Sequence, residues 1–494
     1  MIDNQEPKKY EYLSDNPNIK VIPIMISLII GAFFAILNET LLNIALVTLM
    51  KEFSIPLTTV QWMATGFMLV MAIVIPISAL LLQWFTTRQL FLSTMIVFTI
   101  GTIICASAPT FSILLTGRLI QAVGTGLLMP ILFNVFLLIY PPHKRGKIMG
   151  LLGLVIMFAP AIGPTLSGVI VEYLGWRYLF IVVIPFALFS ILFAYKYLVN
   201  VSEVTKPKID FISIVFSTIG FGSIVYGFSS VGESADGFLS TNVLIAIVAG
   251  VVGIVLFVIR QFKLEEPVMD LRVFKYPMFT HAVLMFLIII MAMFASEIIL
   301  PLYMQGPLAL SAATAGLVLL PGSLLNGIMS PFMGHLFDKF GPKVLMVPAS
   351  LVLSGTMFMM SRLTTETSLW VVIVGYILLM LTVSAIMMPA ETNGLNQLPK
   401  RLYPHGTAVM STLQPVAGAI GVSVFISIMN TRQLKFIQQS DTPNDPATIS
   451  EAMVAGVELV YLIAFAMSIV AVILAFTVYR AVPRDMNEPT KNNN

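Results

Sequence analysis

The stretch of sequence that decides the fold is residues 334–343, which read GHLFDKFGPK and form a short charged turn between two long apolar runs. A worn second copy lies in the first third of the chain. Residues 76–88, PISALLLQWFTTR, align without a gap on residues 331–343, PFMGHLFDKFGPK, and share the proline, a leucine, a phenylalanine and the final cation. The match predicts that one half of the protein occurs twice.

Other residues extend the repeat. The offset of 255 that places residue 76 on residue 331 also places Pro160 on Pro415 and Gly163 on Gly418. Glu39 and Glu297 correspond at an offset of 258, as a small difference in loop length would produce. Chance matching among Leu-rich and Gly-rich segments is the alternative. Two parallel six-helix repeats around a central cavity are a recurrent architecture of secondary transporters.

The composition places the chain in a lipid bilayer. Hydrophobic residues make up 58% and charged residues 10% of the sequence, and the mean hydropathy is +0.94. A soluble enzyme is excluded by these values. Helix spans need roughly 20 apolar residues, and runs of that length favour helices over a barrel. We predict fourteen spans, near residues 21–48, 60–82, 90–108, 112–139, 147–171, 177–199, 210–231, 241–261, 279–305, 313–335, 343–361, 368–390, 405–430 and 455–480.

The distribution of positive charge predicts the orientation. Of the 27 Lys and Arg residues, 21 fall on one set of alternate loops, five fall on the other set, and Arg118 remains inside the membrane. Because cytoplasmic loops carry the excess of positive charge, both termini are expected to be cytoplasmic. An even number of spans is then required, which supports fourteen.

The predicted organisation has five parts in chain order: a cytoplasmic tail, a six-helix bundle, two additional transmembrane helices, a second six-helix bundle and a second cytoplasmic tail. These parts are residues 1–20, 21–199, 207–262, 279–480 and 481–494. The segment 431–454 is expected to be the longest external loop, because its turn residues suggest an irregular excursion.

Several chemistries have no sequence signal. There is no phosphate-binding loop for ATP, and the four histidines have no metal-ligand spacing. We therefore expect no cofactor, no metal, no nucleic-acid partner and no catalytic site. Transport driven by an ion gradient remains.

Acidic residues inside apolar runs are the first candidates for function. Glu39 lies within the first span, where a bare charge costs roughly 2.5 to 3.5 kcal/mol. Burial favours the neutral form of a carboxyl group, so such a group can bind and release a proton. Glu297 has the equivalent place in the second half, and Glu391 lies toward a helix end. The alternative is a protonated side chain that bonds a neighbouring helix. Glu172 and Glu458 are expected to be interfacial.

Arg118 is the one cation placed inside the membrane. Arg does not deprotonate usefully, so it must be paired. A carboxylate that alternates between Arg118 and a proton would couple proton binding to conformation. A permanent structural pair, or snorkelling from a shallow position, is the alternative.

Two segments are candidate gates. Residues 159–168, APAIGPTLSG, put Pro160, Gly163 and Pro164 in a span, where they can form a functional bend or a simple packing kink. In the charged turn, Asp338 precedes a helix that opens near Gly341, and Lys339 and Lys343 can pair with acidic groups. Making and breaking those pairs would favour one facing state. The alternative is that the two lysines only fix the topology.

A cavity for drug-sized compounds is expected to use adaptable Met and aromatic side chains together with a few amides. Most of the candidates are expected to face lipid or pack in the core, with about a third lining the cavity. They are Phe33, Phe34, Asn38, Gln61, Trp62, Phe67, Met157, Phe158, Met291, Phe294, Tyr303, Gln305 and Gln414.

Taken together, these motifs resemble the major facilitator superfamily, and specifically its fourteen-spanner drug:proton antiporters of the EmrB/QacA type. Within that family the chain looks most like the lincomycin-exporting group of Gram-positive bacteria. The resemblance implies outward drug transport against inward proton flow. It rests on Gln61-Trp62, Arg118-x-x-Gln121 with Gly124, PHKRG at 142–146, Gly163-Pro164, Trp176-Arg177, Pro267 with Phe274, LPLYMQ at 300–305 and Pro389.

Three departures from the family pattern matter. Asn38 stands where the family usually has Asp, so Glu39, about 100° further round the helix, must serve if the acid is needed. Neutral residues replace the acidic, glycine and basic members of the first cytoplasmic turn, at Gln83, Thr86 and Thr87. Ser167 replaces a glycine of the exporter motif.

Because only the second copy of the turn keeps both charge types, Asp338→Asn is expected to impair transport more than any single change within residues 76–88. Substrate accumulation measured with each variant checks this prediction. An equal or larger defect from a change in the first copy would contradict it.

The sequence therefore predicts a multi-pass transporter of the bacterial plasma membrane that exports amphipathic organic compounds in exchange for protons and acts as a monomer among membrane lipids. Two alternatives stay open: an exporter of one physiological metabolite or signalling molecule, and a membrane sensor without flux.

Overall fold

The structure is a computed structural model that describes residues 21–139, 142–200, 204, 210–231, 237–264, 267, 269–399 and 402–481. Of residues 142–157 the backbone alone is described. The predicted tail at 1–20 and all but the first residue of the predicted tail at 481–494 lie outside the described residues, as does the side chain of Met157.

Helices are the only regular secondary structure in the described part of the chain, as the sequence predicts. They are α1 (Val21–Phe53), α2 (Leu57–Val60), α3 (Trp62–Trp84), α4 (Thr87–Ser107), α5 (Phe111–Ile139), α6 (Pro142–Tyr173), α7 (Tyr178–Ile181), α8 (Val183–Tyr197), α9 (Phe211–Ser229), η3 (Gly237–Leu239), α10 (Thr241–Lys263), η4 (Leu271–Lys275), α11 (Pro277–Gln305), α12 (Ala312–Phe340), α13 (Pro342–Met360), α14 (Leu369–Asn396), α15 (Tyr403–Gln438) and α16 (Pro446–Thr477).

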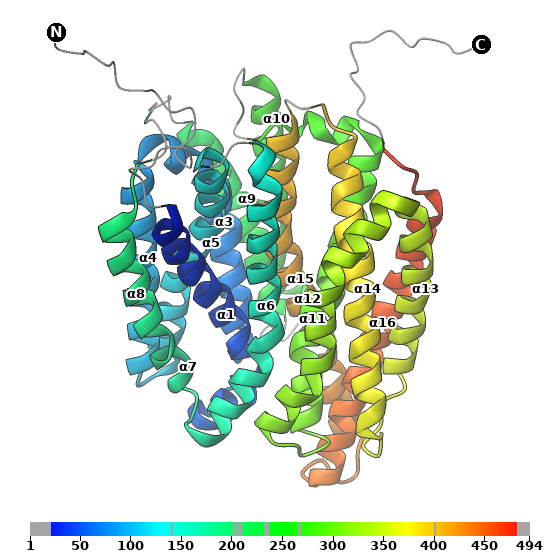
Figure 1. The fold of residues 1–494 in the computed structure, drawn as a ribbon. Coiled ribbons are helices and arrows are strands. Elements are labelled where there is room, and N and C mark those ends of the chain that lie inside the picture. The colour runs from blue at the N-terminus through cyan, green and yellow to red at the C-terminus, as the bar shows by residue number, and fades with distance from the viewer. Residues whose placement is uncertain are drawn as a thin grey trace, which may run out of the picture.

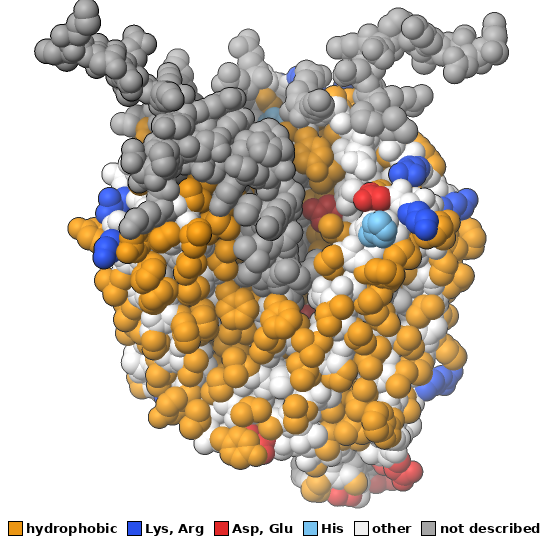
Figure 2. Space-filling model, in the orientation of Figure 1, with side chains coloured by type: hydrophobic (Ala, Val, Ile, Leu, Met, Phe, Trp, Pro, Cys, Tyr) orange, Lys and Arg blue, Asp and Glu red, His pale blue; other side chains and the backbone are white. Residues whose placement is uncertain are grey.

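The membrane spans agree with the predicted helical class. Thirteen helical segments in the described residues are long and apolar enough to cross a bilayer, with α2–α3 and α7–α8 each forming one span. The remaining long helix, α6, has 32 residues and runs through the bundle beside them (Figure 1). On the face in Figure 2, hydrophobic side chains form a belt and the charged ones gather toward its two ends. The all-helical membrane fold is thereby confirmed.

The helices form two groups that stand side by side in Figure 1. Helices α1, α3 to α6 and α8 form the N-terminal half, and α11 to α16 form the C-terminal half. The accessory pair is α9 and α10, and α9 packs against α10, α3 and α15. We call the end of the bundle where α1 begins and α16 ends the terminus side, and the opposite end the distal side. That the terminus side is cytoplasmic stays a prediction.

The charged turn is shorter than predicted. Helix α12 continues to Phe340 and α13 begins at Pro342, so Gly341 alone joins them. Gly341 has φ of 81°, which glycine adopts readily, and proline suits the first position of a helix. In the worn copy, Thr86 caps α4 through a capping box with Gln89. Thr86, which stands where the family usually has glycine, therefore serves as a helix cap.

The predicted long loop at 431–454 is wrong. Helix α15 extends to Gln438 and α16 begins at Pro446, which leaves residues 439–445 as the connection. Asp445, which the sequence pattern assigns to a turn, accepts a hydrogen bond from the Ala447 amide at 3.3 Å and caps α16. Turn residues and helix caps are the same residue types, and this explains the error.

Candidate functional site

Arg118 on α5 is the centre of a buried polar cluster in the N-terminal half. Its side chain is 1% exposed, and its guanidinium carbon lies 3.9 Å from the centre of the Phe67 ring. It donates to Asn38 Oδ1 at 2.6 Å, to the Glu39 carbonyl at 3.1 Å, and to the Met63 carbonyl and Gln121 Oε1, both at 3.3 Å. One cation therefore ties α5 to α1 and α3.

All the described partners of Arg118 are neutral. No carboxylate oxygen lies within ion-pair distance of it in the part of the chain that the structure describes. Asn38 faces Arg118 directly, whereas Glu39 contributes only its backbone carbonyl because the next residue of a helix points about 100° away. Alternation of a carboxylate between Arg118 and a proton stays a prediction.

Asn38 is held to Arg118 by its oxygen alone. Its side chain is fully buried, and Nδ2 has no hydrogen-bond partner among the residues that the structure describes. An aspartate at this position, as in the resembling family, would offer Arg118 two acceptors and leave no unpartnered donor. Asn38 keeps the hydrogen bond to Arg118 but lacks the negative charge that an aspartate would have at this position.

Changing Asn38 tests this arrangement. Asn38→Leu is expected to destabilise the protein by about 1.5 to 3 kcal/mol, because it removes a hydrogen bond to a charged group and leaves Arg118 short of an acceptor. Asn38→Asp is expected to keep or raise stability. Thermal unfolding in detergent measures both, and a leucine variant as stable as the parent would show that the contact carries no weight.

The two acids predicted for proton coupling come from opposite halves. Glu39 on α1 and Glu297 on α11 are both partly buried. Asn43, one turn after Glu39, donates through Nδ2 to Glu297 Oε2 at 3.4 Å and so joins the halves beside these acids. The Glu39 carboxyl group has no hydrogen-bond partner among the described residues, which leaves it available to a ligand or a proton.

Helix α6 clamps α1 around Glu39. A Cβ at Gly163 would lie 2.1 Å from Thr40 Oγ1, so only glycine permits this approach. One turn later, the Ser167 hydroxyl donates to the Leu41 carbonyl. Pro160 and Pro164 lie within the same continuous helix. The predicted gating segment therefore contacts the residues that follow Glu39.

The distal ends of the two halves are bonded to each other. Thr165 Oγ1 donates to the Gly316 carbonyl at 2.8 Å, and Glu172 Oε2 accepts from the Ala313 amide at 2.8 Å, which joins α6 to α12. Gln305 Nε2 donates to the Ile44 carbonyl at 3.1 Å and joins α11 to α1. The conformation is thus closed on the distal side.

Sequence reasoning did not assign these distal contacts. The sequence analysis assigns no role to Asn43 or Thr165 and expects only that Glu172 is interfacial. The spacing of four between Glu39 and Asn43 was a usable signal, because such residues share a helix face. The partners of Thr165 and Glu172 lie in another half and have no local signal.

The gating residues of the turn make few contacts. Asp338, Lys339 and Lys343 are exposed, and no ion pair of Asp338 is found in the described part of the chain. Arg480 instead donates to the Asp338 backbone carbonyl at 2.8 Å. A latch at this turn stays a prediction. Glu391 is partly buried on α14, without a described hydrogen bond.

The residues predicted to bind substrate are spread through both halves. Phe34 stacks on Phe186 of α8 with ring centres 3.9 Å apart. Tyr303 is fully buried and donates to the Thr364 carbonyl at 2.6 Å. Met291 and Phe294 pack against glycines of α15, whereas Phe158 is 45% exposed. Phe33, Trp62 and Gln414 are partly buried, and Phe67 and Gln61 are buried.

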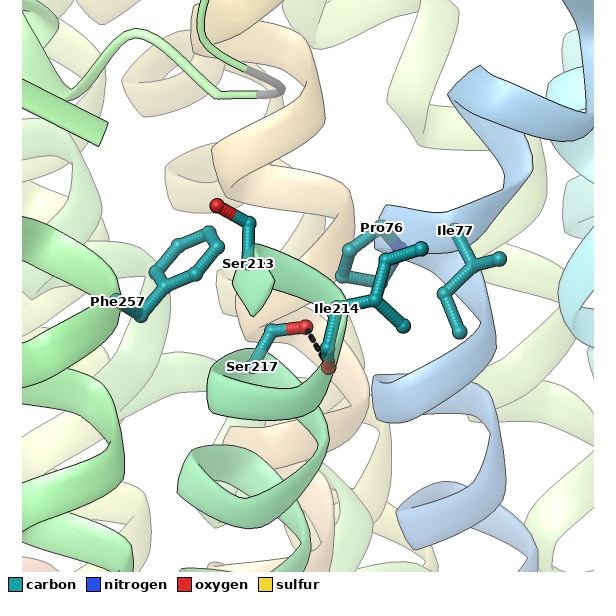
Figure 3. Close-up of a pocket in the computed structure, with 6 residues that line it drawn as sticks. All are labelled: Pro76, Ile77, Ser213, Ile214, Ser217 and Phe257. Carbon is teal, nitrogen blue, oxygen red and sulfur yellow. Dashed lines mark hydrogen bonds between the residues drawn. The ribbon is translucent and has the colours of Figure 1, made fainter. Parts of the chain in front are cut away.

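The pocket in Figure 3 lies between α3 and the accessory pair, and its lining includes none of the predicted substrate-binding residues. Assignment of those residues to a drug site stays a prediction. The lining residues are Pro76, Ile77, Ser213, Ile214, Ser217 and Phe257.

Comparison with known proteins identifies relatives over nearly the whole chain. The chain is 51% identical over 461 residues to the lincomycin resistance protein LmrB of Bacillus subtilis, covering 93% of this chain and 96% of that protein. It is 48% identical over 463 residues to the lincomycin resistance protein LmrB of Listeria monocytogenes, covering 94% and 98%. The resemblance to Gram-positive exporters is thereby confirmed.

A solved structure supports the fold. A bacterial homologue of the human lysosomal transporter Spinster aligns with a TM-score of 0.64 at 15% identity, covering 92% of this chain and 95% of that one. The family model of the Major Facilitator Superfamily matches residues 28–422. A multi-pass protein of the bacterial plasma membrane, and a transporter in place of an enzyme, follow from these relatives and from the membrane-spanning helices. The chain belongs to the major facilitator superfamily.

Proposed function

We propose that the protein exports amphipathic organic compounds across the plasma membrane in exchange for protons, by alternating access. The observation that carries the proposal is the placement of Glu39 and Glu297. One acid comes from each half, and the two lie on helices joined by the bond from Asn43 to Glu297. A change of charge at Glu297 therefore acts directly on a contact between the halves, and Glu39 lies one helical turn before the donor of that contact, Asn43.

The cycle uses these groups in sequence. Substrate enters from the terminus side while the distal contacts at Thr165, Glu172 and Gln305 hold the far end shut. Substrate binding displaces a proton from Glu39, assisted by Glu297. The distal side then opens, substrate leaves, and a proton from outside returns to the acid. Arg118 bonds the Glu39 backbone carbonyl, and its positive charge favours the ionised form of the nearby carboxyl group.

The relatives support drug efflux and leave its breadth open. Two proteins that match nearly the full chain are named for lincomycin resistance. A broad range of amphipathic substrates is our first proposal, and export of one compound class is the second. A sensor without flux is disfavoured, because the relatives' names describe resistance.

A deletion strain tests the proposal. Susceptibility to chemically diverse compounds, and their accumulation in the cells, would be measured in the deletion strain and in the complemented strain. Both measurements are made with and without an uncoupler. The deletion strain is expected to accumulate several compounds to higher levels than the complemented strain does. The uncoupler is expected to abolish this difference. A difference for one compound alone would favour the specific exporter, and a difference that survives the uncoupler would exclude proton coupling.

A further inference from the structure

One residue of the accessory pair is bonded to both halves at once. Ser229 is the last residue of α9, at its distal end. Its backbone carbonyl accepts from Gln61 Nε2 at 3.2 Å, and Gln61 belongs to the N-terminal half. Its hydroxyl lies 2.7 Å from the hydroxyl of Ser423, on α15 of the C-terminal half. All three side chains are fully buried.

The accessory pair is built as a firm unit around this contact. At the distal end, the Tyr226 ring packs against Trp62 of α3, with ring centres 5.8 Å apart. At the terminus side, Arg260 of α10 holds Asp210 through contacts of 2.6 to 2.9 Å. The hydrogen bond to Arg260 also keeps the pKa of Asp210 below its ordinary value. Movement at Ser229 would therefore be shared by the pair.

The contact completes the closure of the distal side. Helices α6 and α12 are joined by Thr165 and Glu172. Helices α3 and α15 pack together elsewhere in the bundle, and the end of α9 lies against both. We infer that the accessory pair is a working part of the transporter: through Ser229 it braces α3 to α15 and holds the distal side closed, and this bond is released when that side opens.

The bond is suited to repeated release. A serine hydroxyl within a helix can turn back to a carbonyl of its own chain three or four residues earlier, so neither hydroxyl is left unpartnered when the halves separate. Ser217 makes this kind of bond to the Ile214 carbonyl at 3.0 Å on the same helix (Figure 3). An ordinary hydrogen bond of this kind would shift the equilibrium between closed and open states by about fivefold.

Two single variants and their combination test the brace. Ser229→Ala and Ser423→Ala each remove the bond, and the double variant removes nothing further. Ser217→Ala is the matched control, because Ser217 is a buried serine of the same helix whose one hydrogen bond among the described residues goes to the Ile214 carbonyl of that helix. If one variant fails to fold, the other reports on the same bond from the opposite half.

The measurement is the distance between two spin labels, one on each half. The labels replace the exposed distal residues Tyr178 and Ile449. All variants carry Cys105→Ser, so that the buried native cysteine is not labelled. Each single variant is expected to raise the ratio of distal-open to distal-closed molecules about fivefold over the parent, and the double variant to match the single ones. Ser217→Ala is expected to match the parent.

Variants that match the Ser217→Ala control, or a double variant whose effect is the product of the single effects, would overturn the brace. The inference rests on the alternating access of the proposed function, but the labels report conformation without substrate or proton gradient. A failed brace would leave the proton-coupled export intact, and a failed uncoupler test would leave the distance result intact.

Discussion

Glu39→Gln is expected to reduce substrate-driven proton release from inverted membrane vesicles to the background of vesicles that lack the protein. Glutamine has nearly the size and shape of glutamate but cannot ionise. The Glu39 carboxyl group makes no described hydrogen bond, and its backbone carbonyl, which the substitution preserves, accepts from Arg118. The variant should therefore fold and remain in the membrane while proton exchange stops.

The control for this experiment is Glu458→Gln. Glu458 is an exposed residue of α16, and its neutralisation should leave proton release at the parent rate. Glu297→Gln is informative as a third variant, because a glutamine oxygen can still accept from Asn43 while the negative charge is lost. Undiminished release by Glu39→Gln would refute the assignment of the coupling acid to position 39.

The spans could be predicted because each is a continuous apolar run, and a bilayer demands such runs whatever their neighbours. Helix ends were harder. The stretch from Gly334 to Phe340 is polar enough to suggest a turn, yet it continues α12 until Gly341 breaks the helix. Polarity marks where a chain meets water, and it does not mark where a helix stops.

The functional residues could be predicted individually but their partners could not. Arg118 and Glu39 are conspicuous as charges inside apolar runs. The choice of Asn38 as the partner of Arg118 depends on how α1 is rotated about its axis. The sequence gives little guidance about this rotation, because apolar residues occur on every face of α1. Ser229 and Ser217 look alike in the sequence, and only the packing of α9 on both halves distinguishes them.

The second large effect is expected at Arg118. Arg118→Ala would leave Asn38 Oδ1 and the carbonyls of Glu39 and Met63 without their donor in a dry interior, and would remove the stacking on Phe67. Each buried acceptor that loses its partner in this way typically costs about 1 to 3 kcal/mol. We expect a large drop in the thermal midpoint in detergent and a low yield of folded protein.

Arg118→Lys separates charge from geometry. Lysine keeps the positive charge near Glu39, but a compact ammonium group cannot reproduce the planar fork that reaches α1 and α3 together. Stability should fall less than in the alanine variant, while proton-coupled transport should be lost. Arg177→Ala is the control, because its pair with Glu52 is about 40% exposed and is worth less than about 1 kcal/mol. If the lysine variant transports at the parent rate, then positive charge alone suffices, and the fork that joins α5 to α1 has no part in coupling.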